Sequence, residues 1–297
     1  MMAGCRIYWR ALFVGIAAAV SLQADDVPTV VPPLNADPSP DYYAGKIVWA
    51  NLYTTDVAAS TKFYTQLFGW TAQSVPGRGP RSILALNGRP IAGVVTRSAR
   101  MRDLAHGRWV PFASVPDVAA ALSAAAADGG RTLHAAHSVP DRGEQGVFAD
   151  AEGALFGVIH SSSGDPGEYL AEPGEWVWAE LFARDTEAEA KFYADVAGYE
   201  PVPDRRTAEP NRFVLVSGSY SRASIVPVPN RPRAHPAWLL FVRVQDVKAA
   251  ADQAAALGGR VIIAPSLSPL HHEQAIVADP TGGAVGLVEL PAAEDSR

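Results

Sequence analysis

Cysteine is nearly absent from the sequence: Cys5 is the only one among 297 residues. A single cysteine cannot form an internal disulfide, and its place ahead of an apolar N-terminal run makes it a poor lipid anchor. If that run were cleaved, the mature chain would have neither a thiol nucleophile nor a thiolate ligand for a metal. Cysteine catalysis and zinc–thiolate sites are therefore not expected.

Basic clusters and long apolar runs are lacking too. The formal net charge is −6 and no segment concentrates Lys or Arg, so nothing offers a footprint for nucleic-acid phosphates. Beyond residue 24 no apolar stretch is long enough to cross a bilayer. A nucleophile elbow, a phosphate-binding loop and paired groups at catalytic spacing are also missing. We expect no nucleic-acid partner, and no membrane contact once the N-terminus is cleaved.

Residues 1–24 have the pattern of a secretory signal peptide. Arg6 and Arg10 precede an apolar run, 11–22, that is too short to span a bilayer comfortably. An uncleaved N-terminal anchor is the alternative, but the shortness of the run and the acids after it favour cleavage. We therefore expect a secreted or periplasmic protein. Residues 25–44 are rich in proline, which disfavours helix and strand pairing and predicts an extended tether.

The rest of the chain repeats itself at a constant offset of 129 residues. The matched pairs include Trp49 and Trp178, Asp56 and Asp185, Tyr64 and Tyr193, Gly69 and Gly198, His106 and His235, Trp109 and Trp238, Glu144 and Glu273, Asp150 and Asp279, and Gly157 and Gly286. Matches spread over more than a hundred residues indicate duplication of a whole domain. We expect two domains, at residues 45–162 and 174–291.

A five-element unit occurs twice within each copy. In the first unit, alternating strand formers precede an Asp56 N-cap, a helix that ends at Gly69 and a hairpin turn at Asn87-Gly88. The expected strands of copy one are residues 47–53, 71–75, 82–86, 90–96, 109–115, 131–135, 145–149 and 155–160, and the expected helices are 58–68 and 117–128. Four such units per chain predict an α+β protein built of curved sheets.

These residues carry a family resemblance. Val48-Trp49-Ala50-Asn51-Leu52, followed by Phe63-Tyr64 and Phe68-Gly69-Trp70, resembles the opening of a vicinal oxygen chelate (VOC) domain, from the glyoxalase, bleomycin-resistance and extradiol dioxygenase superfamily. The second copy repeats these elements, so the resemblance covers residues 46–290. It implies tandem βαβββ units, four in total, that form two glyoxalase-like half-open barrel domains. For function it is less specific, because this fold supports isomerases, dioxygenases, epoxide-opening enzymes and drug-sequestering proteins.

The resemblance also implies a metal site whose ligands this chain lacks. Catalytic members of the family hold a divalent metal with His or Glu on the first strand of each unit and Glu near the end of its last strand, which leaves room for two substrate oxygens. Here the last-strand positions fall on Gly157 and Gly286, and Gly93 and Arg222 lie near the remaining ones. We therefore assign no metal ligand and expect no cofactor, without excluding a divalent metal bound in another way.

Tryptophans take the first-strand positions in all four units: Trp49, Trp109, Trp178 and Trp238. Core packing and the lining of a cleft for a flat ligand both fit such residues. Alternate residues of a strand share one face, so an inward Trp49 places Asn51 inward, and an inward Trp178 places Glu180 inward. The difference between Asn51 and Glu180 indicates that the two copies do not hold the same ligand.

His271-His272-Glu273 has the composition of a metal-binding cluster. Adjacent residues on a strand point to opposite faces, however, so the two histidines cannot easily share one ion. The first copy has Arg142-Gly143-Glu144 at this place, and only the glutamate is common to both copies. A structural role for the cluster is therefore favoured.

Three functions remain open. The leading hypothesis is a secreted or periplasmic glyoxalase-like protein that lacks the usual metal ligands and binds a small, partly aromatic molecule in its cleft. The second is a VOC-type lyase or dioxygenase with a metal or acid/base site rebuilt around Glu180, His235 or residues 271–273. The third is a non-catalytic scaffold in which duplication only supplies surface.

Copy two is the better candidate for the functional one. It alone places a carboxylate, Glu180, beside a first-strand tryptophan, and Arg212 and Arg222 fall on hairpin strands of the same half. A few polar groups around an apolar floor fix the orientation of a ligand. We take these residues as the ligand-binding set, with Asn51 and the four tryptophans, and Glu180 as the candidate catalytic group. The competing interpretation is a structural ion pair between Glu180 and Arg222.

Overall fold

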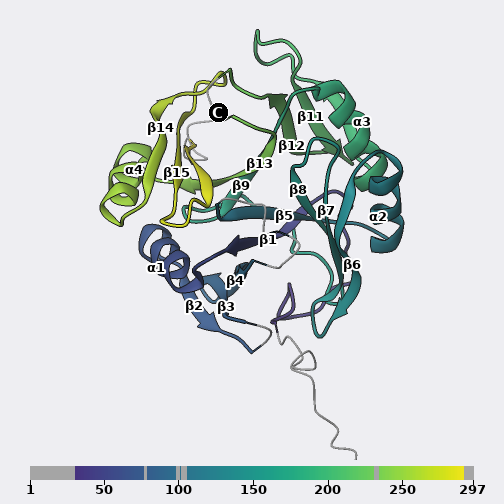
Figure 1. The fold of residues 1–297 in the computed structure, drawn as a ribbon, viewed down its shortest axis with the longest axis horizontal. Helices are drawn as coiled ribbons and strands as arrows, with labels where there is room; N and C mark the ends of the chain where they lie inside the picture. Colours follow the sequence, from purple (N-terminus) through teal and green to yellow (C-terminus); the bar gives the residue numbers. More distant parts are fainter. Residues whose placement is uncertain (1–30, 77–78, 98–100, 102–105, 231–233, 291–297) are drawn as a thin grey trace, which may run out of the picture.

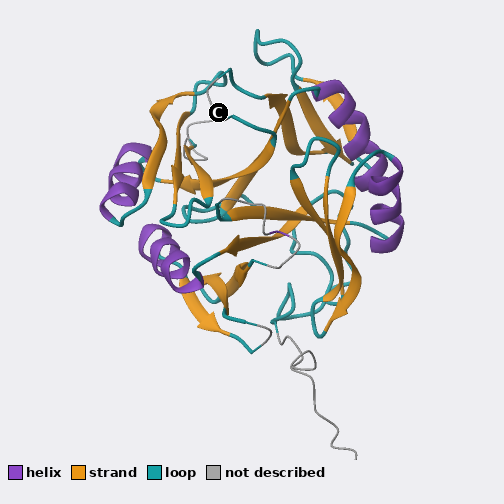
Figure 2. Cartoon of the chain, in the orientation of Figure 1, coloured by secondary structure: helices purple, strands orange, loops and turns teal. Residues whose placement is uncertain are grey.

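Two open eight-stranded sheets form the protein, one from each copy of the repeat (Figures 1 and 2). The computed structural model describes residues 31–76, 79–97, 101, 106–230 and 234–290. The expected signal peptide, residues 1–24, lies outside the described residues, as does the tether before residue 31. We call the first sheet with its helices domain 1 and the second sheet with its helices domain 2.

Domain 1 follows the predicted order of elements. It consists of β1 (Ile47–Thr54), α1 (Val57–Phe68), β2 (Thr71–Ser74), β3 (Arg81–Leu86), β4 (Arg89–Thr96), β5 (Arg108–Ser114), α2 (Val118–Ala127), β6 (Arg131–Val139), β7 (Gly143–Ala149) and β8 (Leu155–Ser161). The strand order is β2-β3-β4-β1-β5-β8-β7-β6. Strand β1 pairs parallel with β4 and antiparallel with β5, so the first strands of both units lie side by side at the centre.

Domain 2 repeats this arrangement. It consists of β9 (Trp176–Ala183), α3 (Thr186–Ala197), β10 (Glu200–Pro203), β11 (Phe213–Ser217), β12 (Tyr220–Pro227), β13 (Ala237–Val244), α4 (Val247–Ala256), β14 (Arg260–Leu267), β15 (Glu273–Ala278) and β16 (Ala284–Glu289). The strand order is β10-β11-β12-β9-β13-β16-β15-β14. The predicted α+β class, with its four βαβββ units in two domains, is thus confirmed, and both described sheets are open.

Local sequence signals set the helix ends. The side chains of Asp56, Asp117, Asp185 and Asp246 each accept a hydrogen bond from the backbone N–H three residues further on. Such a bond satisfies one of the free amides in the first turn. Helices α1 and α3 end at Gly69 and Gly198, whose φ angles of 70° and 71° lie in the left-handed region that favours glycine.

The main hydrophobic core lies between the two domains and includes Trp109, Trp238 and the tyrosines next to them. Trp109 Nε1 donates to Tyr64 Oη at 2.9 Å, and Trp238 Nε1 donates to Tyr193 Oη at 2.7 Å. Each tyrosine then donates across the domain boundary, Tyr64 to the Gly283 carbonyl and Tyr193 to Asp150, both at 2.9 Å. Helix α1 contacts α4, and α2 contacts α3, so the helices form one pair on each flank of the molecule (Figure 1).

The hydrogen bond from Tyr193 to Asp150 lies next to a second buried acid, Glu189. Glu189 of α3 is 2% exposed and faces Asp150, and its Oε2 atom has no hydrogen-bond partner among the described residues. Burial, and then the charge of Asp150, raise the pKa of Glu189. The matching residue of copy one is Ser60, which shares hydrogen bonds with Thr54 and Thr281 and carries no charge.

This acid pair should make folding stability fall as pH rises. A carboxyl group whose pKa is raised in the folded state binds more protons there than in the unfolded chain, so its stabilising effect is present at low pH and is lost through the raised pKa. We expect the free energy of unfolding to drop by about 1–3 kcal/mol between about pH 5 and 8. Urea unfolding of the chain and of Glu189→Gln measures this. The variant should lose most of the pH dependence, whereas Ser60→Ala should keep it. A slope that is unchanged in Glu189→Gln would contradict the assignment.

Candidate functional site

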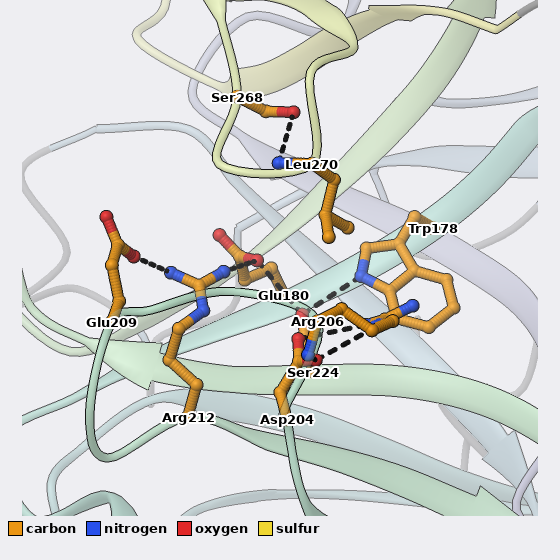
Figure 3. A network of polar contacts seen from close by, with 9 residues as sticks. All are labelled: Trp178, Glu180, Asp204, Arg206, Glu209, Arg212, Ser224, Ser268 and Leu270. Carbon is orange, nitrogen blue, oxygen red and sulfur yellow. Dashed lines mark hydrogen bonds and ion pairs between the residues drawn. The ribbon is translucent and has the colours of Figure 1, made fainter.

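Each sheet has one face that packs against the helices and the other domain, and an opposite face that we call the helix-free face. On the helix-free face of domain 2, polar side chains form a network around Glu180 of β9 (Figure 3). Trp178 Nε1 donates to Ser224 Oγ at 2.9 Å, and Ser224 Oγ donates to Glu180 Oε2 at 2.9 Å. Arg212 Nη2 lies 3.5 Å from the same Oε2 atom, and its Nη1 atom donates to Glu209 at 2.6 Å. The predicted sharing of one face by Trp178 and Glu180 is confirmed by this network.

Glu180 is a largely buried carboxyl group. Its side chain is 17% exposed, and burial raises its pKa, while the charge of Arg212 and the Ser224 hydrogen bond act in the opposite direction. Among the described residues its Oε1 atom has no hydrogen-bond partner. The side chain of Leu270 points toward Trp178 and Glu180 from the turn that follows β14 (Figure 3). In the described structure, an apolar side chain and a carboxylate oxygen without a partner therefore lie near an indole ring.

Arg222 does not take part in this network. Its Nη1 atom donates to Glu168 Oε1 at 2.7 Å, and its guanidinium lies 4.8 Å from the Tyr220 ring centroid. The hypothesis of a Glu180–Arg222 ion pair is therefore wrong, and Arg212 is the arginine beside Glu180. The reason is the register: Glu180 pairs with Ser224, whereas Asn51 pairs with Gly93, so the hairpins of the two copies are offset by two more residues than the rest of the repeat.

The helix-free face of domain 1 carries Trp49 and Asn51, again as alternation predicted. Trp49 Nε1 donates to Asn51 Oδ1 at 2.9 Å. Trp49 is only 5% exposed, whereas Trp178 is partly exposed. The described part of the tether covers this face: Leu34 is 4% exposed within the same cluster, and Asn35 bonds to Ser163 through its backbone N–H and its side chain. The tether is thus packed against domain 1.

Trp109 and Trp238 lie in the inter-domain core, and neither lines a helix-free face. The residues of β5 and β13 that face the same side as Trp49 and Trp178 are Phe112 and Phe241, which pair with them directly. Of the two interpretations that the sequence left open for the four tryptophans, core packing thus applies to Trp109 and Trp238. Which face Trp109 and Trp238 occupy depends on the register of β1 with β5 and of β9 with β13. The amino-acid composition of the strands does not reveal this register.

The residues present do not fit the metal site of the family. A Cβ atom added at Gly157 or Gly286 would overlap the ring of Phe112 or Phe241, and one added at Gly93 would overlap Asn51 Oδ1. Side chains therefore fill the space where the family places carboxylates. In the part of the chain that the structure describes, no three His, Cys, Asp or Glu side chains gather as a metal site.

The histidine candidates do not gather around a site either. His271 is exposed and adopts a φ of 62° in the turn after β14. His235 Nε2 lies 2.9 Å from Arg108 Nη2, an arginine of the other domain. A nearby cation disfavours metal binding at that ring.

The linker, residues 162–175, joins β8 to β9. A cavity of about 480 Å³ lies between the domains and is lined in part by linker residues 166–171. Aromatic and basic side chains line much of it, namely Trp49, Trp176, Trp178, Tyr169, Tyr220, Lys46, Arg89, Arg222 and Arg243. The linker neutralises part of this charge, since Arg89 pairs with Glu175 and Lys46 Nζ lies 3.3 Å from Glu168 Oε2. The cavity therefore adjoins Trp178 but holds basic groups already bound by the linker.

Comparisons with known proteins agree with this architecture. Residues 46–158 match the family described as the glyoxalase/bleomycin resistance protein/dioxygenase superfamily, and residues 177–288 match a glyoxalase-like domain. The chain belongs to this superfamily. It is 30% identical to the protein named "Putative glyoxylase CFP32" of Mycobacterium tuberculosis, over 82% of this chain and 94% of that protein. It is 29% identical to the anthracycline biosynthesis protein DauV of a Streptomyces species, over 84% of this chain and 97% of that protein.

Solved structures share the fold at low sequence identity. The Mn(II)-bound glyoxalase from Novosphingobium aromaticivorans has a TM-score of 0.57 and 17% identity, over 83% of this chain and 82% of that one. The 2,3-dioxygenase LapB from Pseudomonas sp. KL28 has a TM-score of 0.56 and 15% identity, over 85% of this chain and 96% of that one. At such identities the likeness concerns the fold alone.

The filled ligand positions predict that the chain binds no metal in the manner of its metal-dependent neighbours. Equilibrium dialysis against Mn²⁺, Fe²⁺, Ni²⁺ and Zn²⁺ should show no tight binding of one ion per domain, because Gly157 and Gly286 supply no carboxylate. The Novosphingobium glyoxalase, dialysed in parallel, is the positive control. Stoichiometric binding that survives removal of any expression tag would overturn this prediction.

Proposed function

We propose that the protein binds a small, partly aromatic molecule on the helix-free face of domain 2, without the metal of its superfamily. The observation that carries this is the Glu180 carboxyl, which is largely buried beside the partly exposed Trp178 ring and whose described partners, Ser224 and Arg212, both meet Oε2 and not Oε1. A few polar groups above an apolar floor are the usual means of fixing a small ligand. A hydroxyl or amino group of the ligand would donate to Glu180, and its ring would lie against Trp178.

The contrast between the two domains supports this choice of face. Trp49 and Tyr53 of domain 1 are 5% and 8% exposed under the tether, whereas the corresponding Trp178 and Phe182 of domain 2 are partly exposed. The names of two Streptomyces relatives refer to anthracycline biosynthesis, and anthracyclines are planar, hydroxylated aromatic compounds. A ligand with this chemistry would match both the indole surface and the carboxylate.

A second candidate is acid–base catalysis at the same place, favoured by the raised pKa of Glu180. A buried carboxyl whose pKa moves toward neutrality can take or give a proton in a bound substrate. Such a reaction would be a lyase or isomerase step without metal. Turnover of the bound molecule would identify it, and binding without chemical change favours the leading proposal.

The place of action belongs to the same proposal. No helix in the described residues is long and apolar enough to cross a membrane. We infer from the pattern of residues 1–24 that the protein is exported to the periplasm or beyond. The intact mass of the protein recovered from its source should then correspond to a chain that begins near Asp25, and a mass that includes residues 1–24 would contradict export by cleavage.

Titration calorimetry tests the binding site. Catechol and dihydroxynaphthalene are suitable probes, because both combine a flat ring with neighbouring hydroxyl donors. Glu180→Gln should weaken binding roughly 10-fold or more, since a hydrogen bond to a charged group contributes about 1.5–3 kcal/mol. Asn51→Ala, at the matching position of domain 1, is the control and should change affinity less than 2-fold, on the order of 0.4 kcal/mol. A larger loss in Asn51→Ala would move the site to domain 1.

A further inference from the structure

The helix-free face of domain 1 contains a buried arginine that has no counterion among the described residues. Arg142 lies in the turn between β6 and β7 and is only 2% exposed. Its guanidinium carbon is 3.8 Å from the Trp49 ring centroid, and its Nε atom donates to the Pro32 carbonyl at 2.9 Å. Nη1 and Nη2 are buried and have no hydrogen-bond partner among the described residues.

This arrangement is unfavourable for the protein alone. Arginine carries five N–H donors, and among the described residues only the Nε donor finds an acceptor. Burial lowers the pKa of Arg142 to about 9, so the group still carries its charge at neutral pH. A buried charge is costly unless it is paired, and the contact with one indole ring offsets only part of that cost.

Two other arginines with little exposure, Arg222 and Arg212, have carboxylate partners in the described structure. Arg222 pairs with Glu168 at 2.7 Å, and Arg212 pairs with Glu209 at 2.6 Å. Their side chains are 8% and 12% exposed, so they are less buried than Arg142. These two arginines are therefore neutralised internally, whereas Arg142 has no carboxylate partner among the described residues.

The unpaired donors belong to a residue that lines a small cavity of about 70 Å³. Trp49, Asn51, Ser82 and Gln145 supply aromatic and neutral polar surface, and Arg81 brings a second positive charge. None of the twelve residues that line the cavity in the described structure is acidic. Since a water occupies about 30 Å³ in the liquid, the space suits a short-chain acid better than an aromatic ring.

We propose that this cavity is a second binding site, for a small carboxylate anion held by the two Nη atoms of Arg142. The planar guanidinium fork matches a carboxylate through two parallel hydrogen bonds. Arg81 adds long-range attraction, and Trp49 forms one wall. Pro32 fixes the guanidinium from the tether side, so the described tether is part of the site. This site is separate from the Glu180 face and does not depend on the function proposed for domain 2.

Thermal unfolding of the full chain in acetate tests the proposal. At constant ionic strength, acetate should raise the melting temperature along a saturating curve that chloride does not reproduce, because an anion bound only by the folded state stabilises it. Arg142→Gln should weaken acetate binding roughly 10- to 100-fold, as expected for the loss of charge-assisted hydrogen bonds. Arg142→Lys keeps the charge but not the fork and should recover only part of the affinity.

Two controls keep the result interpretable. Arg131→Gln removes an exposed positive charge from the same domain and should leave the acetate response intact. Without acetate, Arg142→Gln should melt no lower than the parent, because it removes an uncompensated buried charge, and this separates a binding role from a structural one. Phosphate in place of acetate tests for an inorganic oxyanion. A stronger response to phosphate than to acetate, or an equal acetate response in Arg142→Gln, would overturn the proposal.

Discussion

The contact between the domains depends on two tryptophan–tyrosine pairs that cross the duplicated core. Trp109 donates to Tyr64 and Trp238 to Tyr193, and each tyrosine bonds to the opposite domain. Burial makes these hydroxyl groups keep their protons, since it raises the pKa of both tyrosines well above the usual range. Because the core uses these aromatics, only one first-strand tryptophan per domain remains on the helix-free face. The position of the candidate site follows from that division.

Duplication has produced two faces with one backbone plan and opposite chemistry. In domain 1 the tether and Arg142 cover Trp49, which leaves a small positively charged cavity. In domain 2 Trp178 is partly exposed and lies beside the carboxyl of Glu180. In both, aromatic rings occupy the space in front of the last-strand glycines, so a side chain added at either glycine would overlap them.

Local signals in the sequence predicted most of the fold, because they act within a few residues. The Asp56 cap, the Gly69 stop and the Asn87-Gly88 turn all appear where expected, with φ of 51° and 79° at the turn. Strand alternation also placed Trp178 and Glu180 on one face. Strand register was less accessible, since the hairpin shift that brings Ser224 opposite Glu180 depends on the length of the loop before β11. The burial of Arg142 depends on a tether contact 110 residues away and has no local signature.

The indole N–H signals of the tryptophans show whether a ligand binds beside Trp178. In a nitrogen-15 correlation spectrum, each tryptophan gives one such signal, and Trp178→Phe assigns the relevant one. Titration with dihydroxynaphthalene should shift the Trp178 signal in a saturable manner, because its N–H is bonded to the Ser224 hydroxyl that contacts Glu180. The signals of Trp109 and Trp238, buried between the domains, should stay in place. A saturable shift of the Trp49 signal with none at Trp178 would contradict the account.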